Sequence, residues 1–263
     1  MQVLINGKKV EMPKGSRMSD IKGDYDIFVR NGFGVESSTE LFNGDNIIAV
    51  RKGEMPSKDN LTQMIFARNG EKATDKLKNA CVCICGLGGL GSNIAAMLVR
   101  LGVGKLILVD FDIVDPTNLN RQNYFAKDIG SLKTIATERI LKEINPYVEL
   151  ELKNVYVNDD NVMQVICGAD IIVEAFDNPV CKAQLVNNIL SKTDKYIVAS
   201  SGMAGYASSN NIKTSNKLSR LFVCGDSESE AKENMSLMSP RVNICAGHQA
   251  NMVLRLLLGI KEC

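Results

Sequence analysis

The sequence predicts an α/β protein in which a mainly parallel sheet is flanked by helices. Two short apolar runs, at 81–85 and 105–109, are typical of buried parallel strands, because each is too short for a helix and is apolar almost throughout. A glycine-rich turn and a helical pattern lie between them, and this order is that of a Rossmann-like nucleotide fold. A smaller, β-rich segment precedes this region.

The first 53 residues have the pattern of a small β domain. Two short alternating strands joined by Asn6-Gly7 predict a hairpin, and further strand candidates follow at 25–30 and 46–51. The next stretch contains Pro, Ser, Lys and Asp, and this composition predicts an exposed linker. We therefore expect three parts, which are a small domain over 1–53, a linker over 54–60, and a large domain over 61–263 that begins with a helix.

The glycine turn is a candidate phosphate-binding site. Gly86, Gly88 and Gly91 have the spacing G-x-G-x-x-G, which bends the chain tightly and brings backbone amides close to phosphate oxygens. The helix expected from near Ser92 would direct its N-terminal amides at the same place. Asp110 ends the second strand, about where such folds place the carboxylate that accepts the ribose hydroxyls. Together these features predict nucleotide binding.

The remaining elements continue the alternation of strands and helices. The patterns predict helices over 130–144, 159–167 and 241–258, and strands over 148–157, 171–173, 196–200 and 221–223, with a further strand near Ile212. The strand at 171–173 leads into Asp177 and Asn178. Ligands of open α/β sheets bind beyond the carboxyl ends of the strands, and Mg²⁺ takes one or two carboxylates with phosphate oxygens. Asp177 is therefore a candidate magnesium ligand, whereas Asn178, before Pro179, has helix capping as its alternative role.

Composition excludes several classes of protein. The formal net charge of +1 gives no general attraction to nucleic acid or to anionic membrane, and no apolar run approaches the roughly 20 residues that span a bilayer. No signal peptide is visible, and we read the eight cysteines as reduced thiols of a cytoplasmic protein. The sequence contains no C-x-x-C motif, and His248 is its single histidine. We therefore do not expect a structural zinc site. His248 is expected to be a packed or interface residue.

Three motifs together resemble the signature of the ThiF/MoeB/ubiquitin-activating-enzyme family. They are GLGGLGS at 86–92, DFD at 110–112 and NLNRQ at 118–122, and the resemblance extends from about Arg68 to Leu258. It implies a nucleotidyltransferase that uses ATP and Mg²⁺ and works as a homodimer. The residues implied to bind the nucleotide are Gly86, Gly88, Gly89, Gly91, Asp110, Asp112, Thr117, Asn118, Arg121, Lys133, Asp177 and Asn178, with Asp177 also on the metal.

The resemblance also implies catalytic roles. Arg68 would reach the partner subunit's site and hold phosphates, Arg121 and Lys133 would surround the triphosphate, and Asp177 would carry magnesium. A lysine in the first turn of a helix, as at Lys133, is unfavourable beside the helix dipole unless an anion is present. Cys224 is the candidate for a covalent intermediate in the stretch that covers the carrier tail, with a buried structural thiol as the alternative.

The first 53 residues resemble ThiS, the ubiquitin-like β-grasp sulfur carrier of thiamin biosynthesis, in LINGKKVEMPKG and LFNGDNIIAVRKG. A working carrier ends in Gly-Gly, but here Arg51-Lys52-Gly53 continues into Glu54. We expect residues 1–53 to be a degenerate carrier domain that is kept for docking, dimer contacts or regulation. The alternative is an N-terminal extension without such a role. The resemblance then implies adenylation of the C-terminal Gly-Gly carboxylate of a separate ThiS-type carrier, with release of pyrophosphate.

Other functions remain open at this point. A MoeB-like enzyme, or one resembling tRNA threonylcarbamoyladenosine dehydratase, would use the same site, although the carrier-like segment favours the thiamin branch. An NAD-dependent Rossmann oxidoreductase would explain the glycines and Asp110 but would leave Arg121, Lys133 and the Asp177-Asn178 pair without a role. A pseudoenzyme that only docks carriers is disfavoured by the same residues.

Overall fold

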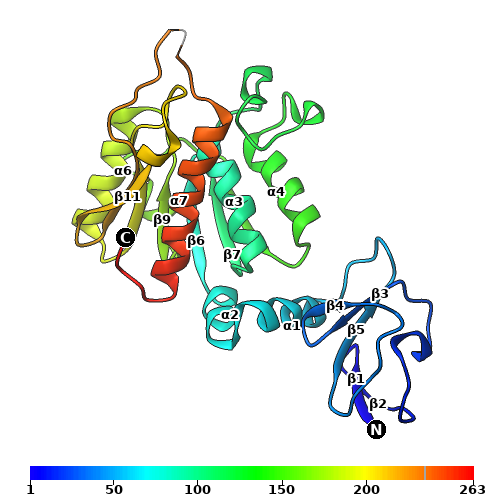
Figure 1. The fold of residues 1–263 in the computed structure, drawn as a ribbon. Coiled ribbons are helices and arrows are strands. Elements are labelled where there is room, and N and C mark those ends of the chain that lie inside the picture. The colour runs from blue at the N-terminus through cyan, green and yellow to red at the C-terminus, as the bar shows by residue number, and fades with distance from the viewer. Residues whose placement is uncertain (234) are drawn as a thin grey trace. The chain divides into compact units, whose positions relative to one another are not determined.

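The computed structural model describes all residues except 234, together with every side chain of the helices and strands except that of residue 71. The described residues form two compact units, Met1–Asp75 and Lys76–Cys263 (Figure 1). The first unit therefore extends beyond the small domain expected from the sequence and includes the segment expected to be a linker. None of the described helices is both long and apolar enough to cross a membrane.

The first unit is built on a mixed sheet in the order β2-β1-β5-β3-β4. The strands are β1 (Gln2–Ile5), β2 (Lys8–Glu11), β3 (Ile27–Arg30), β4 (Phe33–Val35) and β5 (Asn46–Val50). The expected hairpin of β1 and β2 is present, and β1 pairs in parallel with β5. Val3, Met18, Phe28, Leu41 and Ile47 form much of the core beneath the sheet.

Helix α1 (Lys58–Asn69) packs within this first unit. Ser57 caps it by accepting a hydrogen bond from the backbone N–H of Asn60, so the helix begins before the expected Leu61. The Asn46 side chain of β5 donates to Gln63 Oε1 of the helix at 3.2 Å. Tertiary contacts thus hold this helix on the first sheet, and α2 (Glu71–Lys78) follows it.

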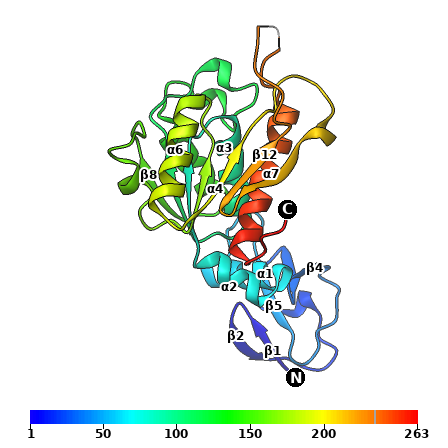
Figure 2. The ribbon, with the colours of Figure 1, turned by 90° about the vertical axis from the view of Figure 1, so that its left-hand side faces the viewer.

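The second unit contains a mainly parallel sheet in the order β11-β12-β10-β9-β6-β7-β8 (Figures 1 and 2). The strands are β6 (Cys81–Cys85), β7 (Lys105–Val109), β8 (Glu149–Lys153), β9 (Ile171–Glu174), β10 (Tyr196–Ser200), β11 (Lys213–Leu218) and β12 (Leu221–Gly225). Only the edge pairing of β11 with β12 is antiparallel in the described sheet. The α/β class predicted from the sequence is confirmed.

Helices cover both faces of this sheet. They are α3 (Gly89–Leu101), α4 (Lys133–Ile144) and α7 (Ser239–Leu257) on one face, and α5 (Val162–Val165) and α6 (Pro179–Lys192) on the other. Successive side chains of a strand point to opposite faces, so β6 serves both cores. Val82 and Ile84 pack with α3 and α7, whereas Cys83 and Cys85 pack with α5 and α6.

Candidate active site

The residues that follow β6, β7 and β9 share one edge of the sheet. Cys85, at the end of β6, is paired with Val109 of β7 on one side and with Glu174 of β9 on the other. Because these strands are parallel, the glycine turn, Asp110 and Asp177 follow them at the same edge.

The glycine turn is held close to the segment that follows β9. Gly86 has φ +96°, and a Cβ at this position would lie 2.7 Å from the carbonyl oxygen of Ala175. A Cβ at Gly91 would lie 1.8 Å from the carbonyl oxygen of Gly86. These two positions therefore require glycine. Gly88 is the N-cap of α3 and Gly89 is its first residue, so α3 begins earlier than the sequence indicated and starts at the same edge.

Asp110 fastens the glycine turn to the end of β7. Its buried carboxylate accepts hydrogen bonds from the backbone N–H of Leu87 at 2.7 Å and of Asp112 at 2.8 Å, one on each oxygen. Burial raises the pKa of Asp110, and Lys133 and these two amides act in the opposite direction. Each oxygen keeps a further lone pair for a ligand.

Lys133 is the first residue of α4 and is buried, with 7% of its surface exposed. Its Nζ lies 2.9 Å from Asp112 Oδ2 and forms an ion pair with it. A carboxylate of the chain itself therefore balances the positive charge at this helix start. Two residues that the sequence placed on the nucleotide thus contact each other.

Thr117 and Asn118 lie in a 3₁₀ turn, Pro116–Asn118, whose conformation their side chains fix. Asp115 accepts from both the N–H and the hydroxyl of Thr117, at 2.8 and 2.6 Å. Asn118 Oδ1 accepts from the N–H of Asp115 at 3.1 Å. The turn delivers Arg121, which donates from Nη1 to the carbonyl oxygen of Thr117 at 3.1 Å.

Arg121 lies against the first residue of α3. A Cβ at Gly89 would be 3.5 Å from Arg121 Cγ, and Asn93 of α3 donates to the Arg121 carbonyl at 3.2 Å. Arg121 Nε is buried and has no hydrogen-bond partner among the described residues. The guanidinium therefore keeps donor capacity beside the helix N-terminus.

The turn after β9 carries Asp177 and Asn178. Asn178 is the N-cap of α6 and accepts from the N–H groups of Val180 and Cys181, which confirms its alternative role. Asp177 is exposed, and in the described part of the chain no side chain pairs with it. No group of three or more His, Cys, Asp or Glu suited to a metal ion occurs among the described residues.

A buried ion pair beneath this turn was not predicted. The Glu174 carboxylate is fully buried and accepts from Lys182 Nζ at 3.0 and 2.9 Å and from the N–H of Phe176 at 2.7 Å. Lys182 Nζ also donates to Ser200 Oγ at 3.0 Å. Burial raises the pKa of Glu174, and Lys182 opposes this shift. The pair ties the ends of β9 and β10 together below Asp177.

Tyr124 is another residue whose role at this site was not predicted from the sequence. Its buried hydroxyl donates to the carbonyl oxygen of Leu87 at 2.7 Å and lies 3.1 Å from Thr137 Oγ1 of α4. The glycine turn is thereby held through Asp110 on one side and Tyr124 on the other. No local sequence signal marks this contact.

Arg68 lies in the first unit, and Cys224 lies in the core of the second unit. Arg68 belongs to the first unit, where its Nε donates to the carbonyl oxygen of Gly32 at 3.3 Å and its guanidinium lies 5.5 Å from the centre of the Phe33 ring. Cys224 was the candidate for a covalent intermediate, with a buried structural thiol as the alternative, and its place in the structure agrees with the alternative. It is a fully buried residue of β12, and burial raises its pKa to about 11. His248 is half-buried, with Nδ1 3.0 Å from Thr214 Oγ1.

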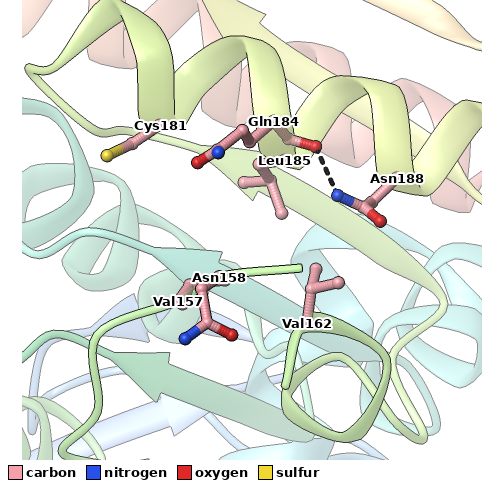
Figure 3. A pocket seen from close by; sticks show the side chains of 7 residues that line it. All are labelled: Val157, Asn158, Val162, Cys181, Gln184, Leu185 and Asn188. Carbon is pink, nitrogen blue, oxygen red and sulfur yellow. Dashed lines mark hydrogen bonds between the residues drawn. The ribbon is translucent and has the colours of Figure 1, made fainter. Parts of the chain in front are cut away.

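Two hollows of the second unit lie away from this edge. A shallow one, without room for a water molecule, lies between α6 and the segment after β8 and is lined by Val157, Asn158, Val162, Cys181, Gln184, Leu185 and Asn188 (Figure 3). A larger one, of about 350 Å³, is lined by Lys76, Asn79, Ala80, Asp170, Ile171, Tyr196, Leu256 and Leu257. It includes the first residues of β9 and β10 and so belongs to the opposite edge of the sheet.

Among curated relatives, a Thermus thermophilus protein called "Sulfur carrier protein adenylyltransferase" is 35% identical over 117 residues, which are 44% of this chain and 43% of that protein. The Candida albicans "Adenylyltransferase and sulfurtransferase UBA4" is 33% identical over 143 residues, which are 54% of this chain and 32% of that protein. The chain thus spans about a third to two fifths of the length of these relatives.

Solved structures share the fold over most of the chain. Escherichia coli tRNA N6-threonylcarbamoyladenosine dehydratase TcdA, crystallised with ATP, matches with a TM-score of 0.68 at 21% identity, covering 74% of this chain and 92% of that one. Escherichia coli MccB with ATP matches with a TM-score of 0.60 at 25% identity, covering 80% and 66%.

Family comparison covers both parts of the chain. A model described as ThiS-like ubiquitin matches residues 1–53, and the model of the ThiF family matches residues 61–263. Because the second match covers most of the sequence, the chain belongs to the ThiF family and carries a ThiS-like ubiquitin domain ahead of its ThiF domain.

Proposed function

We propose that this protein adenylates the C-terminal Gly-Gly carboxylate of a separate ThiS-type sulfur carrier protein with ATP and releases pyrophosphate. The observation that carries the proposal is the joining of Asp110, Lys133 and Arg121 around the glycine turn at one sheet edge. The names of the curated relatives, a sulfur carrier protein adenylyltransferase and an adenylyltransferase and sulfurtransferase, support the same reaction.

The residues at this edge fit a nucleoside triphosphate. The glycine turn leads directly into α3, and the N-terminus of a helix favours phosphate. Asp110 keeps lone pairs for ribose hydroxyls, and Arg121 has an unpartnered buried Nε within the described structure. An unsatisfied buried donor is unfavourable in the protein alone and becomes favourable when an anion accepts from it.

The chemistry requires positioning and charge neutralisation more than a protein nucleophile. Arg121 and Lys133 would hold the negative charge that develops on the departing pyrophosphate, and the ion pair with Asp112 keeps Lys133 in place. The carrier carboxylate would attack the α-phosphorus and form a carrier acyl-adenylate. Cys224 has no part in this step, because it is buried in the core.

Magnesium is part of the proposal. Asp177 would bind it together with phosphate oxygens, and the ion would supply further neutralisation of phosphate charge. The exposed carboxylate of Asp177, next to the capped start of α6, suits this role.

We further propose that the enzyme acts as a homodimer in which Arg68 serves the neighbouring copy. The ThiS-like domain supports the thiamin branch of the family over the MoeB-like branch and over a tRNA dehydratase. The likeness to TcdA concerns the fold alone, at 21% identity.

Pyrophosphate exchange tests this function. The full chain is incubated with ATP, Mg²⁺ and labelled pyrophosphate, with a carrier ending in Gly-Gly, with the same carrier lacking its last glycine, or with tRNA. We expect exchange with the intact carrier only, and a loss of about 100-fold or more in Arg121→Ala and Asp177→Ala, as for removal of a group that stabilises transition-state charge. The exposed Lys127→Ala is the control. Equal exchange with the truncated carrier, or exchange with none of the carriers, would contradict the proposal.

A further inference from the structure

The side chain of Arg68 is held by the turn between β3 and β4. Its Nε donates to the carbonyl oxygen of Gly32 at 3.3 Å, and its Cζ lies 5.5 Å from the centre of the Phe33 ring. The face of an aromatic ring attracts a cation, and Phe33 is 59% exposed, so this ring contacts the guanidinium at the surface of the first unit. Two groups of one turn therefore hold one arginine.

The turn that holds Arg68 is itself fixed in place. Asn31 and Gly32 have φ +50° and +87°, as in the type I′ turns that match the twist of a hairpin. The Asn31 side chain accepts from the backbone N–H of Asn46 in β5 at 3.0 Å. A Cβ at Gly32 would lie 2.2 Å from Cβ of Ala67, so this glycine lets the turn approach the last turn of α1 closely. The carbonyl and the ring thus have a defined position beside Arg68.

The terminal donors of Arg68 stay available for a ligand. A guanidinium has several N–H donors in one plane, and the contact with Gly32 uses only Nε. Arg68 is exposed, and its Nη groups donate to no other residue that the structure describes. A long side chain loses conformational entropy when a ligand immobilises it. The first unit has already restricted this arginine before any anion binds, which lowers the entropy that binding must overcome.

A second arginine–phenylalanine pair in the same unit differs in its charge balance. Arg30 Cζ lies 5.6 Å from the centre of the Phe42 ring, and Arg30 Nη1 lies 3.9 Å from a carboxylate oxygen of Asp45. The charge of Arg30 is thus balanced inside the unit. Among the described side chains, no carboxylate forms an ion pair with Arg68. Of these two arginines, Arg68 is therefore the one that keeps its charge for an anion from outside the unit.

We infer that the ThiS-like domain preorganises Arg68 for the phosphates of the neighbouring copy, with the Phe33 ring and the Gly32 carbonyl as the groups that position it. Phe33 is a positioning residue, because it acts through the arginine and contacts no substrate itself. The inference rests on the proposed function, in which Arg68 serves that copy. It gives a role in the reaction to a carrier-like domain that has no free Gly-Gly tail of its own.

A double-mutant cycle tests this inference in the pyrophosphate exchange assay, with the full chain and a carrier ending in Gly-Gly. Phe33→Ala should slow exchange about threefold, the value of a cation–π contact at an exposed site. Phe33→Glu should slow it about tenfold or more, because its carboxylate would bind the guanidinium in place of phosphate. Phe33→Tyr keeps the ring and should retain exchange. In an Arg68→Ala background the Phe33 substitutions should have no further effect. Phe42→Ala is the matched control.

The outcomes separate the two proposals. Wild-type protein without carrier-dependent exchange overturns the proposed function together with this inference, and so does an Arg68→Ala protein as active as the wild type for the role of Arg68. An impaired Arg68→Ala protein beside fully active Phe33→Ala and Phe33→Glu proteins overturns the inference alone. Equal losses from the Phe33 substitutions with and without the Arg68 side chain, or losses that a lowered unfolding temperature accounts for, show a structural role of the ring and also overturn it.

Discussion

Replacing Lys182 with methionine tests how far the second unit depends on the ion pair beneath the Asp177 turn. Methionine matches the lysine side chain in length as far as Cε and removes its charge. Glu174, which is fully buried, would lose both contacts with Nζ and keep hydrogen bonds from the N–H groups of Phe176 at 2.7 Å and Ser200 at 3.3 Å. An unpaired carboxylate would then remain inside the protein.

Breaking a buried pair by removing one partner costs about 3–5 kcal/mol of unfolding free energy. For Lys182→Met we expect a loss of about 3 kcal/mol of unfolding free energy, at the lower end of this range, because the Lys182 side chain is 24% exposed and Glu174 keeps two amide donors. In a unit of this size, that corresponds to a midpoint about 6–12 °C lower.

The stability that Lys182→Met loses relative to the wild type, called the deficit below, should depend on pH. Burial already raises the pKa of Glu174, and loss of Lys182 raises it further. A folded state that binds the proton more tightly than the unfolded state loses stability as pH rises through the interval between the two pKa values. The Lys182→Met deficit should therefore be larger at pH 8 than at pH 5.

Thermal unfolding followed by circular dichroism at pH 5 and pH 8 measures both effects. Lys182→Arg keeps the charge and should recover most of the stability, and adding Glu174→Gln to Lys182→Met should remove the pH dependence. Lys192→Met, an exposed lysine of the same helix, is the control. A Lys182→Met protein that unfolds like the Lys192→Met protein at both pH values would refute the reasoning.

Three further predictions concern the site and the core. Tyr124→Phe leaves the carbonyl oxygen of Leu87 without its donor and should cost about 1–3 kcal/mol of unfolding free energy, measured by urea denaturation; a change below about 0.5 kcal/mol would contradict this. Asp110→Asn should weaken ATP binding about tenfold by calorimetry, because a neutral amide accepts more weakly from ribose hydroxyls; unchanged affinity would remove Asp110 from the site. Alkylation at pH 8 should label the exposed Cys167 and Cys263 well before Cys224, whose pKa burial raises to about 11, and mass spectrometry showing equal rates would disprove its burial.

The central strands could be predicted from sequence because their signal is local. The runs over 81–85 and 105–109 coincide with β6 and β7, since a strand buried on both faces is apolar at nearly every position and ends at a glycine or a polar residue. The outermost strands of the two sheets have weaker sequence patterns. The strand expected over 148–157 ends at Lys153, where its pairing with Val109 of β7 ends, and β4 has three residues that only pairing with β3 defines.

The site was predictable where a motif sets backbone geometry, and not where two distant side chains meet. The spacing of Gly86 and Gly91 predicted the tight turn, but nothing local indicates that Lys133 pairs with Asp112 or that Glu174 pairs with Lys182. For Cys224 the sequence left two roles open, because its place in the core depends on the pairing of β12 with β10, which extends as far as this residue.

The path of the chain after β5 constrains where the carboxylate substrate comes from. Arg51 Nε donates to the carbonyl oxygen of Asp24 at 2.9 Å, and the N–H of Lys52 donates to Asp26 Oδ2 at 2.9 Å. The stretch where a working carrier would have a free tail is thus fastened to the first unit, and it continues through Gly53 into α1. Adenylation needs a free carboxylate, and a peptide bond follows Gly53. The acceptor in the proposed reaction must therefore be a carrier on another molecule.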